Sequence, residues 1–358
     1  MIRVLHVING MGTGGAEKDI MNWYRNIDRS QVQFDFLIRS NEMFYKCEIE
    51  KLGGRVYQVA GFPRKLFSNI RETKKFIEEN KYKYNVIHVH GNALIYIYPL
   101  ICAKRSGISI RIFHCHSTRA NGKMAALVHK INKFFVSKYA TKLIACSKKS
   151  GLFAFGNRHF EVINNAMDLA RYNKDNLEIK KELQINNEFI VGHIGRFLPV
   201  KNQKFVVDVF QEILMERPNS KLIFVGEGET KQDIQEYVKE KKLFDRVLFL
   251  GERNDVETIL SIIDIIVFPS LYEGVPLVVL EAQASRTRVL YSDVIGEEVE
   301  ITPYVKKQSL NTSAREWASA AIQFCSEKIN CNIEKSFEDK EYTIKAILTQ
   351  LYRIYGEK

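Results

Sequence analysis

The fold class is indicated by Val4-Leu5-His6-Val7-Ile8-Asn9 and the glycine-rich run that follows it directly, Gly10-Met11-Gly12-Thr13-Gly14-Gly15. A short apolar run is typical of a buried strand, and glycines after it permit a tight turn into a helix, expected to begin near Ala16. The loop also satisfies G-x-G-x-x-G, although glycine-rich turns without a ligand are common in α/β folds. A nicotinamide or flavin site would need an acidic residue closing the second strand, which instead ends in Leu37-Ile38-Arg39 with Asp35 inside it.

The rest of the chain repeats this pattern of short β-branched runs and amphipathic stretches, which indicates βαβ units. The candidate strands are Val4–Asn9, Phe34–Ile38, Arg55–Val59, Val86–His90, Ser109–Phe113, Lys142–Cys146, Glu161–Ile163, Ile190–Ile194, Lys221–Val225, Val247–Leu250, Ile265–Phe268 and Arg288–Tyr291. We therefore expect two doubly wound, Rossmann-like α/β domains, residues 1–168 and 169–338, joined by the polar stretch 168–176. Residues 339–358 have the apolar spacing of a final helix that begins near Asp339.

Composition narrows the class of protein. With 358 residues, 46% hydrophobic and 27% charged, the chain suits two globular domains and excludes disordered and collagen-like classes. It contains no uninterrupted apolar run of the ~18 residues that a membrane span needs, and its start does not resemble a signal peptide. Six cysteines without a C-x-x-C pair suit reduced core thiols better than zinc ligands or disulfides. We expect a cytoplasmic protein.

Charge is divided unequally along the chain. Residues 1–168 hold 27 basic and 12 acidic side chains, a net charge of +15, whereas residues 169–358 have a net charge of −4. A basic half suits nucleic acid, an anionic membrane or a phosphorylated substrate. A generally basic proteome would explain the total but not this asymmetry.

The stretch Lys123–Lys138 combines that positive charge with an amphipathic helical pattern. Its apolar positions are Met124, Leu127, Val128, Ile131, Phe134 and Phe135, and its lysines are Lys123, Lys130, Lys133 and Lys138. Such a helix can lie on anionic lipid. An ordinary helix that faces the core, with its lysines in solvent, would give the same pattern.

The second half contains more specific charged motifs. Arg196 and Lys201 lie five residues apart in the loop after a predicted strand, and a pyrophosphate needs positive charge from two directions. Glu273 and Glu281 lie eight apart across a strand-to-helix turn. Glu281 falls within an apolar helix start, where a buried carboxylate would suit the hydroxyl pair of a ribose. The first amides of that helix suit phosphate or sugar oxygens.

Taken together, these motifs resemble those of family-4 glycosyltransferases with the GT-B fold, in particular the enzymes of exopolysaccharide and capsule biosynthesis. The matching stretches, in family order, are Gly14–Glu17, Val162–Asp168, Gly195–Phe197 with Lys201-Asn202, Phe224–Glu229, and Glu273 with Glu281 as E-x7-E. The resemblance implies a retaining hexosyltransferase that uses a nucleotide sugar, expected to be UDP-linked. It also implies that the last helix packs back on the first domain.

The resemblance further implies roles for individual residues. Arg196 and Lys201 would hold the donor diphosphate, Glu281 the ribose, and Glu273 the hydroxyls of the donor sugar. His116 resembles the family's histidine near the donor sugar, with His114 as the competing alignment. The remaining donor-binding candidates are Gly14, Gly15, Gly274, Val275, Leu277 and Val278.

No metal ion or cofactor is expected beyond the donor. The sequence lacks the D-x-D pair that usually holds a divalent metal in the other large transferase fold, and His88 and His90, two residues apart, have no third ligand motif beside them. His90, at the end of its strand, is expected near the ligand.

The expected partners are the donor, a saccharide or polyprenyl-diphosphate-linked acceptor, and an anionic membrane surface, with no nucleic acid. The protein would then act as a peripheral protein on the inner face of the cell membrane. Two other functions stay open. One is a UDP-sugar epimerase of GT-B architecture. The other is a catalytically inactive subunit that binds a sugar nucleotide, which is suggested by Arg286 at a position where the family commonly has glycine.

Overall fold

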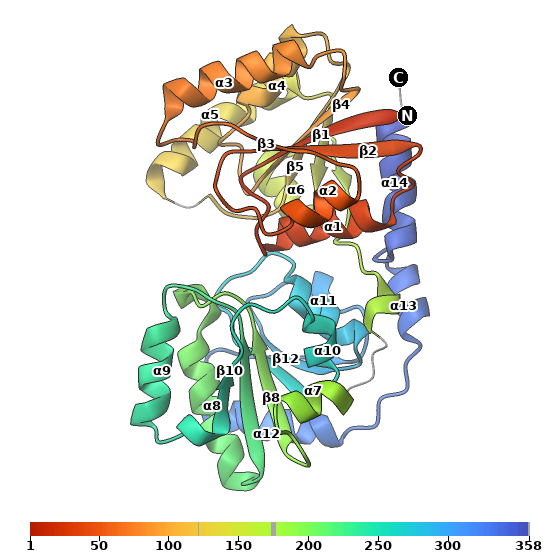
Figure 1. Ribbon diagram of the computed structural model, residues 1–358. Coiled ribbons are helices and arrows are strands. Elements are labelled where there is room, and N and C mark those ends of the chain that lie inside the picture. The colour runs from red at the N-terminus through yellow and green to blue at the C-terminus, as the bar shows by residue number, and fades with distance from the viewer. Residues whose placement is uncertain (121, 173–176, 357–358) are drawn as a thin grey trace. The chain divides into compact units, whose positions relative to one another are not determined.

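A computed structural model describes residues 1–120, 122–172 and 177–356. The chain forms two units, Met1–Ala166 with Glu341–Lys358, and Met167–Lys340 (Figure 1). Positions 173–176 of the expected linker lie outside the described residues. Each unit is built on one parallel sheet, which confirms the predicted pair of Rossmann-like α/β layers.

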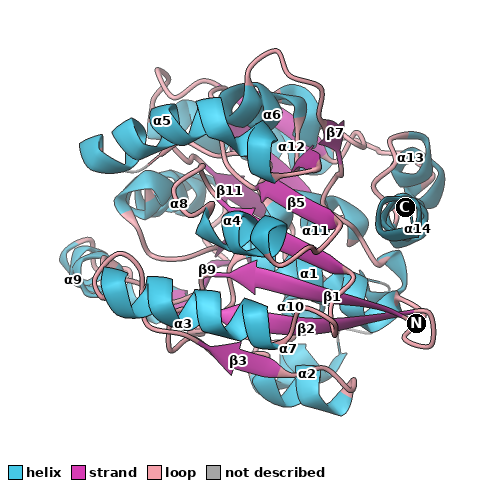
Figure 2. Cartoon of the chain, turned by 90° about the horizontal axis from the view of Figure 1, so that it is seen from above, coloured by secondary structure: helices cyan, strands magenta, loops and turns pink. Residues whose placement is uncertain are grey.

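The first unit contains a seven-stranded parallel sheet in the order β3-β2-β1-β4-β5-β6-β7. Its strands are β1 (Ile2–Ile8), β2 (Val32–Ile38), β3 (Val56–Gln58), β4 (Val86–Gly91), β5 (Ile110–Cys115), β6 (Lys142–Ala145) and β7 (Glu161–Val162). Its helices are α1 (Gly15–Asn26), α2 (Lys46–Lys51), α3 (Leu66–Glu79), α4 (Tyr98–Arg105), α5 (Lys123–Tyr139), α6 (Lys148–Phe155) and α14 (Ile344–Gly356). The helices α3, α4 and α5 overlie one face of the sheet (Figure 2), and α1, α2 and α14 cover the other.

The alternation of side chains along β1 divides the core of this unit into two layers. Leu5 and Val7 pack with residues of α3, α4, α5 and α6, whereas Val4 and Ile8 pack with α1, α2 and α14. A strand that is covered on both sides must be apolar on both sides, which explains the continuous apolar run in the sequence.

The C-terminal helix begins later than predicted. The helix starts at Ile344 and not near Asp339. A separate helix, α13 (Ile333–Asp339), ends at Asp339, and Glu341 then adopts a left-handed φ of 57°, which prevents one continuous helix. Ile347, Leu351 and Ile354 are fully buried in the core on the α1 side. The Tyr352 hydroxyl also accepts a hydrogen bond from the Asp28 backbone N–H at 2.7 Å.

The second unit contains a six-stranded parallel sheet in the order β10-β9-β8-β11-β12-β13. Its strands are β8 (Phe189–Ile194), β9 (Ser220–Val225), β10 (Val247–Phe249), β11 (Ile265–Phe268), β12 (Arg288–Ser292) and β13 (Val305–Gln308). Its α-helices are α7 (Leu177–Glu182), α8 (Gln203–Glu216), α9 (Lys231–Glu240), α10 (Val256–Leu260), α11 (Leu277–Ala284), α12 (Ala314–Ser326) and α13. The short helices η1 (Leu169–Tyr172), η2 (Pro199–Lys201), η3 (Phe244–Arg246) and η4 (Glu297–Val299) complete it.

The predicted strands all occur within two residues of their expected ends, and one strand was missed. This is β13, Val305-Lys306-Lys307-Gln308, which pairs only with β12 at the edge of the sheet. An edge strand is partly exposed to solvent and can carry charged side chains. Because two of the four residues of β13 are lysines, the strand lacks the short apolar run by which the other strands were predicted.

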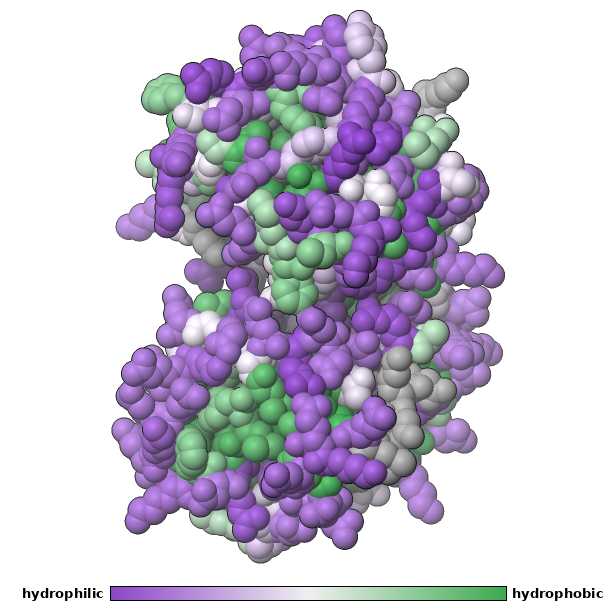
Figure 3. Space-filling view, viewed as in Figure 1, coloured by the Kyte–Doolittle hydropathy of each residue, from purple (hydrophilic) through white to green (hydrophobic). Residues whose placement is uncertain are grey.

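In each sheet, successive strands are first added on one side of the starting strand and then on its other side. This switch lies between β1 and β4 in the first sheet and between β8 and β11 in the second. In open α/β sheets, ligands bind outside the carboxyl ends of the strands at this switch point. Hydrophilic side chains cover most of the face of the molecule shown in Figure 3. Among the described residues, no helix is both long and apolar enough to cross a membrane.

Candidate active site

The charged motifs of the second unit converge at its switch point. Arg196 and Lys201 lie in the loop that follows β8, and Glu273 lies in the loop that follows β11. The two loops are joined by a hydrogen bond from the Leu271 backbone N–H to the Val200 carbonyl, 2.8 Å long. The sheet thus brings together side chains that are more than seventy residues apart in sequence.

Lys201 and Glu273 form a close ion pair. The Nζ of Lys201 lies 2.5 Å from Oε1 of Glu273 and 5.1 Å from the centre of the Phe268 ring. The two charged side chains are only 17% and 15% exposed, so water screens the pair less than it would on an open surface. The pair places one cation and one anion side by side at the carboxyl ends of β8 and β11.

Arg196 is exposed, and no described residue forms an ion pair with its guanidinium. Its backbone is held firmly, because its carbonyl accepts a hydrogen bond from the Gln203 amide at 2.9 Å. The neighbouring Phe197 is buried, and its N–H bonds to the Glu227 carbonyl. A Cβ at Gly228 would lie 2.3 Å from the Phe197 carbonyl oxygen, so only glycine allows this approach between the loops.

Glu281 is a buried carboxylate, 3% exposed, on α11. It accepts a hydrogen bond from the Tyr172 hydroxyl at 3.2 Å. Burial, and then the charge of Glu281, raise the pKa of Tyr172 well above its usual value, so the phenol remains a donor. Gly274 and Val275 precede α11, and Leu277 and Val278 form its first turn, where backbone N–H groups lack helical acceptors.

The glycine-rich loop of the first unit carries acidic neighbours. It packs on residues 40–45, with a hydrogen bond from the Met11 N–H to the Glu42 carbonyl at 2.8 Å. A Cβ at Gly12 would lie 3.1 Å from a carboxylate oxygen of Glu42, and one at Gly14 would lie 2.4 Å from a carboxylate oxygen of Glu17. Two carboxylates make this loop better suited to hydroxyl groups than to a phosphate.

Five histidines form a layer between the sheet and α1 in the first unit. They are His6 on β1, His88 and His90 on β4, and His114 and His116 on and just after β5, brought side by side by the parallel register. The indole of Trp23 stacks on His114 with ring centres 5.8 Å apart. Burial lowers the pKa of His6 to about 3 and that of His116 to about 4, and it lowers the pKa of the other three well below the usual value.

The histidine layer favours His116 over His114 as the ligand-facing residue. His114 is fully buried, and its Nδ1 lies 3.3 Å from Nε2 of His88. His116 is only partly buried, and its Nε2 lies 2.9 Å from Nδ1 of His90. The sequence shows no third ligand motif beside His88 and His90, but among the described residues the sheet brings further histidines close to them. Two groups of three, His6 with His88 and His90, and His90 with His114 and His116, place ring nitrogens within 4.8 Å.

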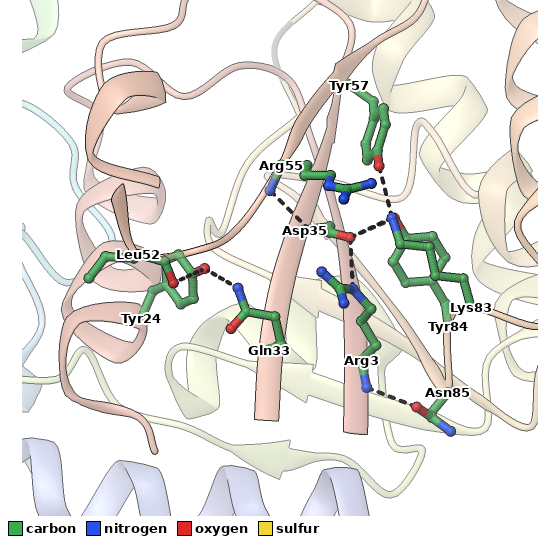
Figure 4. A network of polar contacts seen from close by, with 10 residues as sticks. All are labelled: Arg3, Tyr24, Gln33, Asp35, Leu52, Arg55, Tyr57, Lys83, Tyr84 and Asn85. Atoms are coloured by element: carbon green, nitrogen blue, oxygen red, sulfur yellow. Dashed lines mark hydrogen bonds and ion pairs between the residues drawn. The ribbon is translucent and has the colours of Figure 1, made fainter. Parts of the chain in front are cut away.

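Asp35, which a dinucleotide site would need at the strand end, has a different role. It is fully buried and bonds to Arg3 Nε at 3.1 Å, to Lys83 Nζ at 2.9 Å and to the Tyr84 hydroxyl (Figure 4). Arg3 is the second residue of β1, and Lys83 and Tyr84 precede β4. This network therefore lies toward the amino ends of these strands, away from the switch point.

Sequence reasoning did not explain why Val162–Asp168 forms a motif. Both polar groups of the Ala166 backbone bond to α1: its N–H to Asp19 at 2.7 Å and its carbonyl to the Asn22 amide at 3.1 Å. Burial raises the pKa of Asp19 well above its usual value. The motif therefore fixes the last residue of the first unit before the chain continues into the second.

Arg286 occupies a position whose left-handed backbone conformation favours glycine. Its φ is 60°, directly after the C-terminus of α11, and the Thr287 N–H bonds to the Ala282 carbonyl across it. The side chain is exposed. An arginine is tolerated here at some cost in strain, and the turn that ends α11 is formed.

Two Rossmann-like units, each with functional groups at its switch point, define the class of GT-B transferases. The model of the family described as "Glycosyltransferase Family 4" matches residues 13–171, and the model described as "Glycosyl transferases group 1" matches residues 175–339. The chain is 30% identical to EpsF of Bacillus subtilis (strain 168), which carries the name of a glycosyltransferase, over 99% of this chain and 97% of EpsF. The chain therefore belongs to glycosyltransferase family 4 and is a glycosyltransferase.

Two further comparisons bear on substrates and fold. An Escherichia coli enzyme named UDP-Gal:alpha-D-GlcNAc-diphosphoundecaprenol alpha-1,3-galactosyltransferase is 30% identical over 60% of this chain and 59% of its own. A solved structure of Anabaena Alr3699/HepE in complex with UDP and glucose has a TM-score of 0.80 at 17% identity, and the match covers 99% of this chain and 100% of that chain. At that identity the structural likeness concerns the fold alone.

Proposed function

We propose that this enzyme transfers a hexose from a UDP-sugar to a lipid-linked saccharide, with retention at the anomeric carbon and without a metal ion. The observation that carries the proposal is the Lys201–Glu273 pair at the switch point of the second unit. Lys201 supplies a cation that can bind a diphosphate, and Glu273 supplies a carboxylate that can accept hydrogen bonds from sugar hydroxyls. The name of the E. coli relative supports a UDP-linked donor and a diphosphate-linked lipid acceptor.

Arg196 and Lys201 hold the diphosphate and stabilise it as it departs. Lys201 is already ordered by Glu273, while the guanidinium of Arg196 has no partner among the described residues. A donor bound between them gains charge-assisted hydrogen bonds that strengthen as negative charge develops on the leaving group. The first amides of α11, from Leu277 and Val278, add a helix N-terminus to the same charge.

Glu281 selects the nucleoside. The carboxylate is already desolvated and oriented by Tyr172, so a ribose hydroxyl pair can bond to it without the full cost of stripping water from a charge. Glu273 accepts hydrogen bonds from hydroxyls of the donor sugar, and its bond to Lys201 holds the carboxylate in place beside the diphosphate.

His116, Gly14 and Gly15 serve the sugars from the first unit. With its pKa lowered to about 4 by burial, His116 is neutral at pH 7 and acts through hydrogen bonds rather than charge. Glu17 and Glu42 beside the glycine loop suit acceptor hydroxyls. With no residue assigned as a carboxylate nucleophile, retention follows from a same-face displacement, in which the acceptor attacks on the side from which the diphosphate leaves.

The helix α5 brings the enzyme to the membrane surface that holds its acceptor. Its apolar side chains Met124, Leu127, Ile131 and Phe134 are 73%, 54%, 49% and 77% exposed, so they do not face the core. The buried residues His129 and Val136 occupy the opposite side of the helix. An exposed apolar stripe flanked by lysines, in a half with a net charge of +15, suits an anionic bilayer.

One of the four lysines does not belong to this surface. Lys133 Nζ bonds to the Phe153 carbonyl at 2.7 Å, near the C-terminus of α6. Lys123, Lys130 and Lys138 therefore carry the electrostatic part of the proposal.

The test is product analysis with a panel of UDP-sugars and a polyprenyl-diphosphate-linked saccharide, in excess EDTA. We expect one sugar of the panel to be transferred. NMR coupling constants should show that the product has the same anomeric configuration as the donor. Dependence on Mn²⁺ or Mg²⁺ would contradict metal independence. Interconversion of UDP-sugars without transfer would indicate an epimerase, and binding without turnover an inactive partner.

A further inference from the structure

The histidine layer contains one continuous hydrogen-bonded chain that ends at His116. Nδ1 of His6 lies 2.9 Å from Nε2 of His90, and Nδ1 of His90 lies 2.9 Å from Nε2 of His116. Both ring nitrogens of His90 are therefore occupied. The rings of His6 and His90 are also stacked, with centres 5.2 Å apart, which restrains their orientation.

The direction of this chain follows from its inner end. Nε2 of His6 is buried and has no hydrogen-bond partner. A neutral imidazole carries one proton, and a buried N–H without an acceptor is rarer than a buried lone pair without a donor. The proton of His6 therefore belongs on Nδ1, and that N–H donates to Nε2 of His90.

The remaining protons are then fixed in turn. Because His90 accepts at Nε2, its own proton is on Nδ1 and donates to Nε2 of His116. His116 accepts at Nε2, so its proton is on Nδ1. The second chain in the layer has the same direction: Nε2 of His114 is buried without a partner, His114 Nδ1 faces His88 Nε2, and His88 Nδ1 lies 2.9 Å from the Tyr355 hydroxyl.

We infer that His90, backed by His6, is a positioning residue that locks His116 in the Nδ1–H tautomer, so that His116 meets its ligand as a neutral hydrogen-bond donor and not as a base. The inference rests on the proposed role of His116 in the first unit. It assigns a function to two histidines that the motifs of the family did not distinguish. An imidazole whose tautomer is set by a second histidine needs no reorganisation when the ligand arrives.

Protonation states agree with this arrangement. The chain requires His90 and His116 to be neutral, because a protonated ring has no lone pair with which to accept a hydrogen bond. A protonated His6 would carry a buried N–H without an acceptor at Nε2. Burial lowers the pKa of His116 to about 4 and of His6 to about 3, and it also lowers that of His90. All three are therefore neutral near pH 7.

A metal ion in the same layer is the competing explanation. Both groups of three histidines with suitably close nitrogens contain His90. A metal bound to either group would have to displace one of the two hydrogen bonds that His90 makes. Among the described residues, both groups consist of histidines alone, so neither includes a carboxylate that would offset a divalent charge in a buried site.

The experiment compares His90→Leu with His88→Leu as a matched control. Both residues are buried on β4, two positions apart, and their rings stack at 4.2 Å, so both variants lose similar packing. Of these two residues, His90 is the one that is hydrogen-bonded to His116. A third variant, His90→Gln, keeps one acceptor and one donor on the same side chain and should restore the relay in part.

The first measurement is the tautomer of His116 by ¹⁵N NMR of histidine-labelled protein, assigned with His116→Gln. We expect Nδ1–H in the wild type and in His88→Leu, and a mixture with the Nε2–H form in His90→Leu. An unchanged tautomer in His90→Leu, or an Nε2–H form in the wild type, would overturn the inference. So would one equivalent of zinc bound by the wild type after exposure to Zn²⁺ and lost in His90→Leu.

The second measurement is steady-state transfer. We expect His90→Leu to lower kcat by about ten- to a hundredfold with little change in the KM for the donor, and His88→Leu to change kcat less than about threefold. Equal losses of kcat in the two leucine variants would show that His90 acts only through packing. If His116→Gln is fully active, the proposed role of His116 fails, whereas the tautomer measurement still decides whether the relay exists.

Discussion

At the scale of single residues, the sequence identified the charged groups of the second unit, and the sheet explains how they meet. Arg196, Lys201, Glu273 and Glu281 lie in or beside the loops after β8 and β11. Their roles in binding the donor stay predictions. The histidine relay could not be predicted, because it depends on the register of β1, β4 and β5, and each histidine looks like an ordinary strand residue in its own stretch.

Arg286→Gly should stabilise the second unit. Left-handed backbone costs an L-residue roughly 1–2 kcal/mol, and glycine avoids most of that cost while adding some chain entropy to the unfolded state. We expect the free energy of unfolding to rise by about 1 kcal/mol, with transfer activity unchanged, because the side chain is exposed. Urea denaturation of both proteins measures this. A less stable glycine variant would show that the arginine makes a compensating contact.

At the scale of elements, strands buried on both faces could be predicted and partly exposed elements could not. The buried runs of β8 and β11 are continuous and apolar, whereas β13 is polar and was missed. The amphipathic pattern of α5 was found, but periodicity alone does not say which face is buried. Tertiary packing decides that, and here His129 and Val136 face inward while the larger apolar stripe faces out.

If α5 binds the membrane, Lys123→Glu with Lys130→Glu should weaken vesicle binding. Each lysine near an anionic surface contributes about 1 kcal/mol, so losing two lowers the partition coefficient at least about tenfold. The measurement is co-sedimentation with phosphatidylglycerol vesicles, and binding should fade at high salt, where the Debye length shortens. Lys46→Glu with Lys51→Glu on α2, across the sheet, is the matched control. Equal loss in both pairs would mean that net charge matters rather than α5.

At the scale of the whole molecule, seven histidines whose pKa is lowered by burial should make the enzyme sensitive to mild acid. Burial lowers the pKa of His193 in the second unit to about 4, as it does for His116, and that of His6 to about 3. In the unfolded chain these groups titrate near pH 6.5, so below that pH the unfolded state binds more protons. Their contribution to stability is complete above about pH 6.5 and is lost as the pH falls toward 4.

The expected slope is as much as about 1.4 kcal/mol per pH unit for each such histidine. The carboxyl groups of Asp19 and Asp264 act in the opposite direction, since burial raises their pKa, but they are two groups against seven histidines. Urea midpoints at pH 7, 6 and 5 should therefore fall steadily. Midpoints that stay level or rise on acidification would contradict the burial of these rings as neutral groups.

The proposed function depends on donor binding by the second unit, where Lys201 pairs with Glu273, and calorimetry of UDP binding measures this property. Arg196→Ala and Lys201→Ala each remove a charged partner of the diphosphate, which costs roughly 1.5–3 kcal/mol, or at least about tenfold in Kd. Lys204→Ala, an exposed lysine on α8 that contacts Tyr237, is the control and should bind UDP as the wild type does. Wild-type affinity in both Arg196→Ala and Lys201→Ala would contradict the donor site described for the second unit.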